Sequence, residues 1–275
     1  MARIALLQSC TGIDPAASAA ALVKAIRAAR DGGADMLFTP EMSGIVDRDG
    51  ARARSKIRPE EADEVLAACR EAARTAGIWV HLGSLAVMAT DDKLANRGFV
   101  IDPDGNVRAR YDKMHLFDVD LPTGESWRES ATYRPGSKAI VVQDTPVGNL
   151  GLTICYDLRF PALFAALAEA GADCIAVPAA FTVPTGRAHW DVLLRARAIE
   201  AGVFVIAAAQ TGRHEDGRIT YGHSLVVDPW GEVKLDMGEA PGLDFAEIDP
   251  TRIADVRSRI PALSHRRAIG VVTVQ

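Results

Sequence analysis

The stretch LGLTICYDLRFP, residues 150–161, combines an apolar run, a cysteine and the start of a helix. Its first five residues predict a buried strand. A helix is predicted to begin at about Phe160 and Pro161, so Cys155 falls at a strand-to-helix turn. A nucleophile at such a turn is exposed at the edge of a sheet, beside backbone N–H groups that can bind an oxyanion. The alternative is that Cys155 is a buried, inert cysteine, and this segment alone favours neither interpretation.

Length and charge limit the classes of protein to consider. The chain has 275 residues, of which 48% are hydrophobic and 24% are charged, which is enough for a large core. No Pro-, Gly- or Ser-rich linker interrupts it, and this favours a single domain over residues 1–275. The formal net charge is −5 and no basic run is present. Nucleic acids and anionic membranes are therefore not expected as partners.

The N-terminal segment and the cysteines favour the cytoplasm. Residues 1–8, MARIALLQ, predict a strand rather than a signal peptide, because the apolar run is short. No stretch reaches the roughly 18 apolar residues of a membrane span. The four cysteines lack CxxC spacing, and without an export signal they are not expected to form disulfides. We therefore expect a cytoplasmic protein with reduced thiols.

Strand and helix patterns alternate along the chain. In the first half, helices are predicted at residues 15–30, after the N-cap Asp14, and from about 58 to 76. The strands predicted there are residues 3–8, 34–39, 78–87, 98–102 and 106–111. In the second half, helices are predicted at residues 161–170 and 188–201, each followed by glycine. The strands predicted there are residues 150–154, 173–178, 203–208, 223–227 and 232–235.

The two halves of the chain share a repeated segment. VIDPDGNV at residues 100–107 resembles VVDPWGEV at residues 226–233, and each predicts a turn between two strands. Near-continuous apolar strands, such as residues 203–209, indicate sheets that are covered on both faces. Two packed sheets with helices outside would satisfy this pattern.

Catalysis by a thiol requires a base and a group that stabilises an oxyanion. Glu41 is the best carboxylate candidate, because it follows an apolar strand and Pro40. Lys113 also follows a strand end, among apolar and aromatic residues, where a partly buried ammonium would stabilise an oxyanion. Taken singly, each has the alternative of a solvated surface charge. Histidine is the other possible base, and the chain offers His81, His115, His189, His214, His223 and His265.

Three motifs together resemble the carbon–nitrogen hydrolase (nitrilase) superfamily. They are FTPEMS around Glu41, YDKMHLFD around Lys113 and GLTICYDLRFP around Cys155. The stretches PTGRAHWDVLLRARAIE and GRHEDGRITYGHSLVVDPWG further resemble the Nit branch, which includes deaminated-glutathione amidases and omega-amidases. The resemblance covers essentially the whole chain. It implies an α/β fold, a four-layer α-β-β-α sandwich, and a homodimer or higher homo-oligomer.

The resemblance implies an amidase that works through a cysteine thioester. Glu41 would take the thiol proton, and Cys155 would attack the amide carbonyl. Lys113 and the backbone N–H of Tyr156 would hold the oxyanion. Ammonia would leave, and water activated by Glu41 would hydrolyse the thioester. Whether Cys155 rests as a thiol or a thiolate stays open, because Lys113 would lower its pKa and an ionised Glu41 would raise it.

Further site residues follow from the same resemblance. Glu129 is assigned a positioning role beside Lys113, with Glu125 as the alternative. Arg159 would bind a substrate carboxylate, since a guanidinium fork matches one; the alternative is a helix-start arginine paired with a surface acid. Phe181 and Thr182 would shape the substrate pocket, although core packing is the alternative for Phe181.

Other classes of protein receive less support. GxGxxG, Walker A and HExxH patterns are absent, so neither a cofactor nor a metal is expected. A non-catalytic binding protein and a Cys–His acyl hydrolase remain alternatives. Within the superfamily, deaminated glutathione is the expected substrate. An omega-amidase acting on α-ketoglutaramate or α-ketosuccinamate, a nitrilase and an N-carbamoyl amino-acid hydrolase stay open, and the stretch DVDLPTGESWRES at residues 118–130 resembles omega-amidases.

Overall fold

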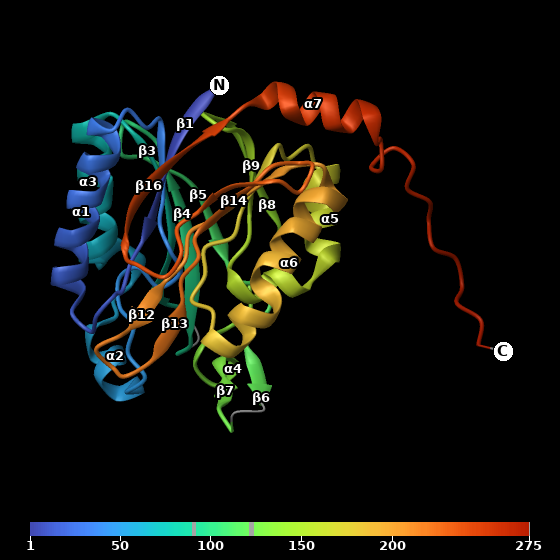
Figure 1. Ribbon diagram of the computed structural model, residues 1–275. Helices are drawn as coiled ribbons and strands as arrows, with labels where there is room; N and C mark the ends of the chain where they lie inside the picture. The colour runs from blue at the N-terminus through green and yellow to red at the C-terminus, as the bar shows by residue number, and fades with distance from the viewer. Residues whose placement is uncertain (90–91, 121–123, 275) are drawn as a thin grey trace.

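The computed structural model describes residues 1–89, 92–120 and 124–274. Two six-stranded β-sheets pack face to face, and helices cover the outer face of each sheet (Figure 1). The predicted four-layer α-β-β-α sandwich is therefore confirmed. Residues 121–123, which fall within the stretch DVDLPTGESWRES, lie outside the described ranges. Within those ranges, no helix combines the length and the apolar character needed to cross a membrane.

Both sheets have the same pattern of strand pairing. In spatial order, the first sheet contains β16 (Gly242–Ile248), β1 (Ala2–Gln8), β2 (Met36–Phe38), β3 (Trp79–Met88), β4 (Leu94–Ile101) and β5 (Val107–Asp112). The second contains β8 (Ile140–Thr145), β9 (Gly148–Leu152), β10 (Cys174–Ala176), β11 (Phe204–Ala207), β14 (Leu225–Val227) and β15 (Val233–Asp236). In each sheet the second to fourth strands are parallel, and the other pairs are antiparallel. Short strands pair outside the sheets: β6 (Asp118–Asp120) with β7 (Ser126–Arg128), and β12 (Thr211–Arg213) with β13 (Ile219–Tyr221).

The repeated segment of the sequence forms the same turn in both sheets. Asp102, between β4 and β5, accepts hydrogen bonds from the backbone N–H groups two and four residues further on, at 3.0 and 2.8 Å. Asp228, between β14 and β15, does the same at 2.9 and 2.8 Å. Gly105 and Gly231 provide the left-handed residue of each turn, with φ of +78° and +86°. The similarity between the two segments is therefore a similarity of backbone hydrogen bonding.

Two helices cover each sheet. Figure 1 shows α1 (Pro15–Asp31) and α3 (Glu64–Ala76) outside the first sheet, and α5 (Pro161–Glu169) and α6 (Val183–Ala201) on the opposite side of the sandwich. Asp14 caps α1 as predicted, because its side chain accepts a hydrogen bond from Ala16 N at 3.1 Å. The remaining helical segments are α2 (Gly50–Lys56), α4 (Glu129–Thr132) and α7 (Pro250–Arg259), with the 3-10 turns η1 (Glu60–Ala62) and η2 (Cys155–Arg159).

Several predicted boundaries were wrong. The second predicted helix begins at Glu64 rather than at residue 58, because Asp63 caps it by accepting a hydrogen bond from Leu66 N at 2.8 Å. Helix α6 begins at Val183 rather than at residue 188, with a proline in its first turn, where no intrahelical N–H is needed. Strand β16 was not predicted, and it pairs antiparallel with β1 from the other end of the chain.

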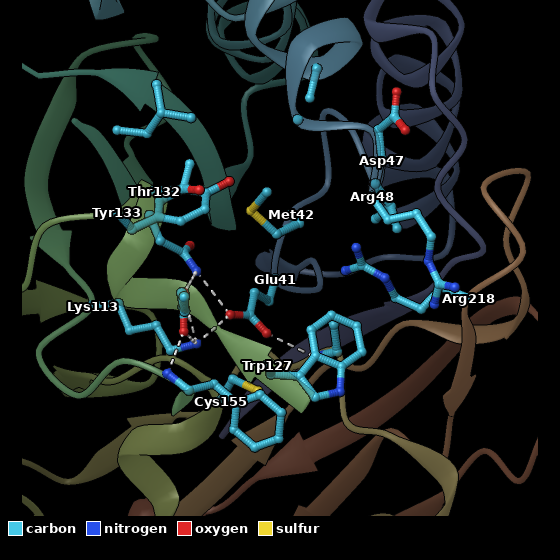
Figure 2. A pocket seen from close by; sticks show the side chains of 18 of the residues that line it. Glu41, Met42, Asp47, Arg48, Lys113, Trp127, Thr132, Tyr133, Cys155 and Arg218 are labelled. Atoms are coloured by element: carbon cyan, nitrogen blue, oxygen red, sulfur yellow. Dashed lines mark hydrogen bonds and ion pairs between the residues drawn. The ribbon is translucent and has the colours of Figure 1, made fainter. Parts of the chain in front are cut away.

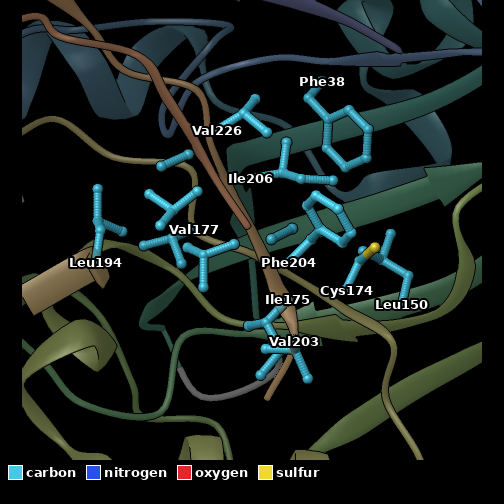
Figure 3. Packing of buried hydrophobic residues seen from close by; sticks show 14 of the residues in the cluster. Phe38, Leu150, Cys174, Ile175, Val177, Leu194, Val203, Phe204, Ile206 and Val226 are labelled. Carbon is cyan, nitrogen blue, oxygen red and sulfur yellow. The ribbon is translucent and has the colours of Figure 1, made fainter. Parts of the chain in front are cut away.

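Apolar side chains of both sheets share one core. Phe38 of β2 belongs to the same buried cluster as Phe204 and Ile206 of β11, and Figure 3 shows these side chains directed into the interior between the sheets. A second cluster lies between the first sheet and helices α1 and α3, where Leu22 and Leu66 are buried. Close packing of this kind resists relative movement of the sheets. Loops that follow strands of different sheets are therefore held in a fixed geometry.

Candidate active site

Cys155 occupies a strained turn after strand β9. Its φ is +51°, in the left-handed region that residues other than glycine rarely adopt. A hydrogen bond of 2.9 Å from Cys155 N to Pro178 O ties the turn to the segment after β10. The chain then continues through η2 into α5, which begins at Pro161. This is the predicted strand-to-helix turn, and it places the Cys155 side chain, 8% exposed, at the wall of a cavity.

The carboxylates of Glu41 and Glu129 surround the Lys113 ammonium, and Figure 2 shows Lys113 and Glu41 beside Cys155. Lys113 Nζ lies 2.9 Å from Glu41 Oε1 and 2.9 Å from Glu129 Oε2. Glu41 follows β2 and Lys113 follows β5, so loops of the first sheet meet the Cys155 turn of the second. The side chains of Lys113 and Glu41 are only 3% and 5% exposed. This burial excludes the alternative of solvated surface charges for both residues.

Glu129, rather than Glu125, is the second carboxylate beside Lys113. Asn96 Nδ2 donates hydrogen bonds to Glu129 Oε1, at 3.2 Å, and to Glu41 Oε1, at 2.9 Å. The amide therefore bridges the two carboxylates that hold the ammonium. Glu125 is exposed and lines a neighbouring cavity instead.

Burial and neighbouring charges set the protonation states of the cluster. Burial and the Glu41 charge raise the pKa of the Cys155 thiol well above its ordinary value, against the opposing effect of Lys113. Burial acts to raise the pKa of Glu41, but the Lys113 charge and three side-chain hydrogen bonds bring it below its ordinary value. Burial acts to lower the pKa of Lys113, yet the charges of Glu129 and Glu41 raise it well above its ordinary value. At neutral pH the site therefore holds the Cys155 thiol, the Glu41 carboxylate and the Lys113 ammonium.

A cavity of about 610 Å³ opens onto this cluster, a size typical of small-molecule sites. Tyr156, Phe181 and Thr182 line it. Arg159, the fourth predicted residue, does not line the cavity. Its guanidinium carbon lies 5.8 Å from the ring centroids of both Tyr156 and Phe181. Its Nη2 is 3.3 Å from His189 Nδ1. The structure thus brings three of the four predicted substrate-binding residues to the cavity wall.

The arrangement is suited to acyl transfer through a nucleophilic thiol. A thiol, a carboxylate that can take its proton and an ammonium that can stabilise an oxyanion share one cavity. None of the six histidines, all of which fall in described parts of the chain, lines this cavity. Over residues 1–89, 92–120 and 124–274, no group of three or more His, Cys, Asp or Glu side chains is placed to hold a metal ion.

Asp157 joins the loop of Lys113 to the turn of Cys155. One oxygen of its fully buried carboxylate accepts hydrogen bonds from Tyr111 Oη, at 2.7 Å, and from the backbone N–H just before Cys155, at 2.9 Å. The other accepts a hydrogen bond of 3.0 Å from His115 N and lies 2.7 Å from His115 Nδ1. Because Tyr111 and His115 flank Lys113, this carboxylate fixes the ammonium loop relative to the thiol turn.

Three supporting residues were missed at the level of sequence. Asn96 gave one usable signal, a lone amide within the apolar strand LANRGFVI. Ala180 contributes only its backbone N–H, which donates to Glu41 Oε2 at 2.9 Å, so its side chain carries no sign of the role. Asp157 lies within the cysteine motif itself, where a carboxylate near a helix start suggests only a capping or surface acid.

Replacing the Asp157 carboxylate should destabilise the fold. In Asp157→Asn the amide nitrogen faces donors that need an acceptor, so we expect the free energy of unfolding to fall by about 2–3 kcal/mol. Tyr111→Phe removes only one of these hydrogen bonds and should cost about 1 kcal/mol. Urea unfolding followed by circular dichroism measures both. Equal stability of Asp157→Asn and the unmodified protein would contradict the role of this carboxylate as a clamp.

Comparison with known proteins agrees with this geometry. The family model named carbon-nitrogen hydrolase matches residues 3–258. A Yersinia enterocolitica protein named deaminated glutathione amidase is 40% identical over 272 residues, covering 98% of this chain and 94% of that protein. A human protein of the same name is 42% identical over 246 residues, covering 88% and 75%. The crystal structure of Saccharomyces cerevisiae Nit3, a member of branch 10 of the nitrilase superfamily, has a TM-score of 0.86 at 29% identity and covers 97% of both chains. The chain therefore belongs to the carbon–nitrogen hydrolase family, as its three motifs predicted.

Proposed function

We propose that this hydrolase of carbon–nitrogen bonds is an amidase that cleaves deaminated glutathione through a Cys155 thioester. The observation that carries the chemistry is that the buried ion pair of Glu41 and Lys113 lines the same cavity as the Cys155 thiol. The substrate is inferred from the relatives in Yersinia enterocolitica and human that bear the name deaminated glutathione amidase.

Acylation begins with a proton transfer from Cys155 Sγ to Glu41. Cys155 and Glu41 line the same cavity, and Glu41 is the carboxylate there that can accept the thiol proton. The sulfur then attacks the amide carbonyl, and the oxygen that becomes negative is stabilised by Lys113 Nζ and the backbone N–H of Tyr156. Glu129 keeps the ammonium in position through its contact of 2.9 Å. As the tetrahedral intermediate collapses, Glu41 returns the proton to the leaving amine and the carbon–nitrogen bond breaks.

Deacylation uses the same carboxylate in reverse. Glu41, again ionised, accepts a proton from water while the water oxygen attacks the thioester carbonyl. Collapse of the second tetrahedral intermediate breaks the carbon–sulfur bond and releases a carboxylic acid. The proton held by Glu41 returns to Cys155, which restores the thiol. One carboxylate thus acts alternately as base and acid, and Lys113 stabilises the oxyanion in both halves.

The leaving amine distinguishes the two leading substrates. In deaminated glutathione the keto-acid portion is joined by an amide to cysteinylglycine, so cysteinylglycine departs. In α-ketoglutaramate the amide nitrogen is unsubstituted, so ammonia departs. Release of ammonia, expected from the motifs, therefore applies to the omega-amidase alternative.

We expect purified protein to release cysteinylglycine from deaminated glutathione faster than ammonia from α-ketoglutaramate. Chromatography of the dipeptide and an enzymatic assay for ammonia measure the two products. Cys155→Ala should abolish both, because no other thiol lines the cavity. Preference for α-ketoglutaramate would replace the proposed substrate with that of an omega-amidase. Cysteinylglycine release that survives Cys155→Ala would contradict the thioester mechanism.

The pH profile should identify the base. Activity requires an ionised Glu41, and this form is lost only when the pH falls through the lowered pKa of Glu41. Activity also requires a charged Lys113, and this form is lost only when the pH rises through the raised pKa of Lys113. We therefore expect kcat/KM to be flat through neutral pH, to decline in acid as Glu41 is protonated, and to decline again only at strongly alkaline pH as Lys113 loses its proton. A histidine base would instead produce a decline near pH 6.5, at about the ordinary histidine pKa. Glu41→Gln should lower kcat at least about 100-fold.

We also propose that two copies of the chain associate through the surface formed by the end of α6, the turn between β14 and β15, and the end of α7. Ile199 of α6, Trp230 and Ile260 are 52%, 51% and 55% exposed and line one groove. Exposed apolar surface of this kind is typical of protein interfaces. Light scattering after size exclusion should give the mass of a dimer, and Ile199→Asp should give that of a monomer. Met88→Asp is the control, because Met88 is an exposed apolar residue on β3, away from this groove, and the variant should remain a dimer. The proposal would be contradicted if the unmodified protein were a monomer.

A further inference from the structure

Two buried hydrogen-bond donors in the wall of the catalytic cavity have no partner. Trp127 Nε1 and Arg218 Nε are inaccessible to solvent, and neither makes a hydrogen bond to any residue that the structure describes. Both residues line the same cavity as Cys155. Buried donors are nearly always satisfied in folded proteins. Two such donors in one cavity therefore indicate that an acceptor is supplied from outside the chain.

The two donors lie together, and the Arg218 donor belongs to a positively charged guanidinium. The guanidinium carbon of Arg218 stands 5.0 Å from the Trp127 ring centroid. Burial and the Arg48 charge lower the pKa of Arg218, and both arginines line the cavity. The Asp216 carboxylate, 3.5 Å from Arg218 Nη2, offsets one of these two charges. The local charge is therefore positive, which favours an anionic acceptor.

The loop that carries Arg218 is held in place before any ligand binds. His214 N donates to Arg218 O at 2.8 Å, and the His214 ring is fixed between Thr11 O and Thr220 Oγ1, each at 2.8 Å. Asp216 accepts hydrogen bonds from the backbone N–H groups of Arg218, at 2.9 Å, and Arg48, at 2.8 Å. These bonds fix the loop that carries the guanidinium, so binding an anion requires little ordering of the backbone.

This positive wall lies away from the nucleophile. Figure 2 shows Arg48 and Arg218 on one side of the cavity, Lys113 and Cys155 on the other, and Trp127 between them. A substrate whose amide carbonyl contacts Cys155 therefore needs an extended arm to reach Arg218. Both portions of deaminated glutathione end in a carboxylate, and the cysteinylglycine portion is the longer of the two.

We propose that Trp127 and Arg218, with the charge of Arg48, form a subsite for the terminal carboxylate of the leaving amine. This inference rests on the proposed function, because it assigns the cysteinylglycine end of that substrate to this wall. When the Trp127 and Arg218 side chains turn toward the cavity, the carboxylate accepts hydrogen bonds from Trp127 Nε1 and Arg218 Nε, the two buried donors that have no partner among the described residues. A guanidinium and a carboxylate form strong, charge-assisted hydrogen bonds. The subsite selects amides with an acidic, extended leaving group over simple carboxamides.

The test uses binding in the Cys155→Ala background, where no turnover occurs. Calorimetry would compare deaminated glutathione with its C-terminal glycinamide, which lacks only the terminal charge. We expect the glycinamide to bind about 10- to 100-fold more weakly, as for loss of a hydrogen bond to a charged group. Arg218→Met should weaken the binding of deaminated glutathione by a similar factor. It should leave the affinities for the glycinamide and for α-ketoglutaramate unchanged. Trp127→Phe keeps an aromatic ring but removes the N–H donor. It should weaken the binding of deaminated glutathione by a smaller factor and leave the binding of the other two ligands unchanged.

Arg213→Met is the matched control. Arg213 is exposed, lies in the same hairpin and does not line the cavity, so its loss changes the net charge equally without touching the subsite. The subsite would be overturned if deaminated glutathione and its glycinamide bound equally well, or if Arg218→Met weakened the binding of all three ligands equally. It would also be overturned if deaminated glutathione did not bind. Failure of the proposed function is seen separately, as absence of cysteinylglycine release by the unmodified enzyme.

Discussion

The Lys113 ammonium is buried between two carboxylates, and the geometry of the active site depends on this ion cluster. Its Nζ lies 2.9 Å from both Glu41 and Glu129. A buried charge is tolerated only where opposite charges and hydrogen bonds compensate it, and removing one partner of a buried pair typically costs about 3–5 kcal/mol. The ends of β2, β5 and β7 must therefore converge on one point. The sandwich fold makes this convergence possible, because its packed sheets hold the loops in register.

The same cluster sets the resting state of the nucleophile. Burial and the Glu41 charge raise the pKa of Cys155, so the sulfur stays protonated until Glu41 takes the proton. A protonated thiol reacts slowly with oxidants and alkylating agents, because the thiolate is the reactive form. The strained backbone at Cys155 and the Asp157 clamp keep the sulfur beside Glu41. Cys155 therefore becomes reactive only when its sulfur attacks a substrate carbonyl while Glu41 takes the thiol proton.

The features that could be predicted from the sequence were those that depend on residues close together along the chain. The Asp14 cap, the repeated turns and the strand-end positions of Glu41, Lys113 and Cys155 each depend on a few neighbouring residues. Features that depend on distant partners were not predictable. Strand β16 pairs with β1 across almost the whole chain, and its sequence alone does not reveal that partner. The pKa shift of Cys155 depends on burial and on distances to charges from other strands, so its sign emerged only from the packed structure.

The charges of the cavity also constrain how an acidic substrate can lie in it. Acidic side chains outnumber the ammonium two to one in the cluster of Glu41, Glu129 and Lys113. A substrate carboxylate is repelled from this end of the cavity and attracted to the guanidinium groups at the other end. Opposite signs at the two ends therefore orient an amide before any specific contact forms. Such orientation keeps the scissile carbonyl, rather than the carboxylate of the leaving amine, beside Cys155, and effective nucleophilic attack requires this placement.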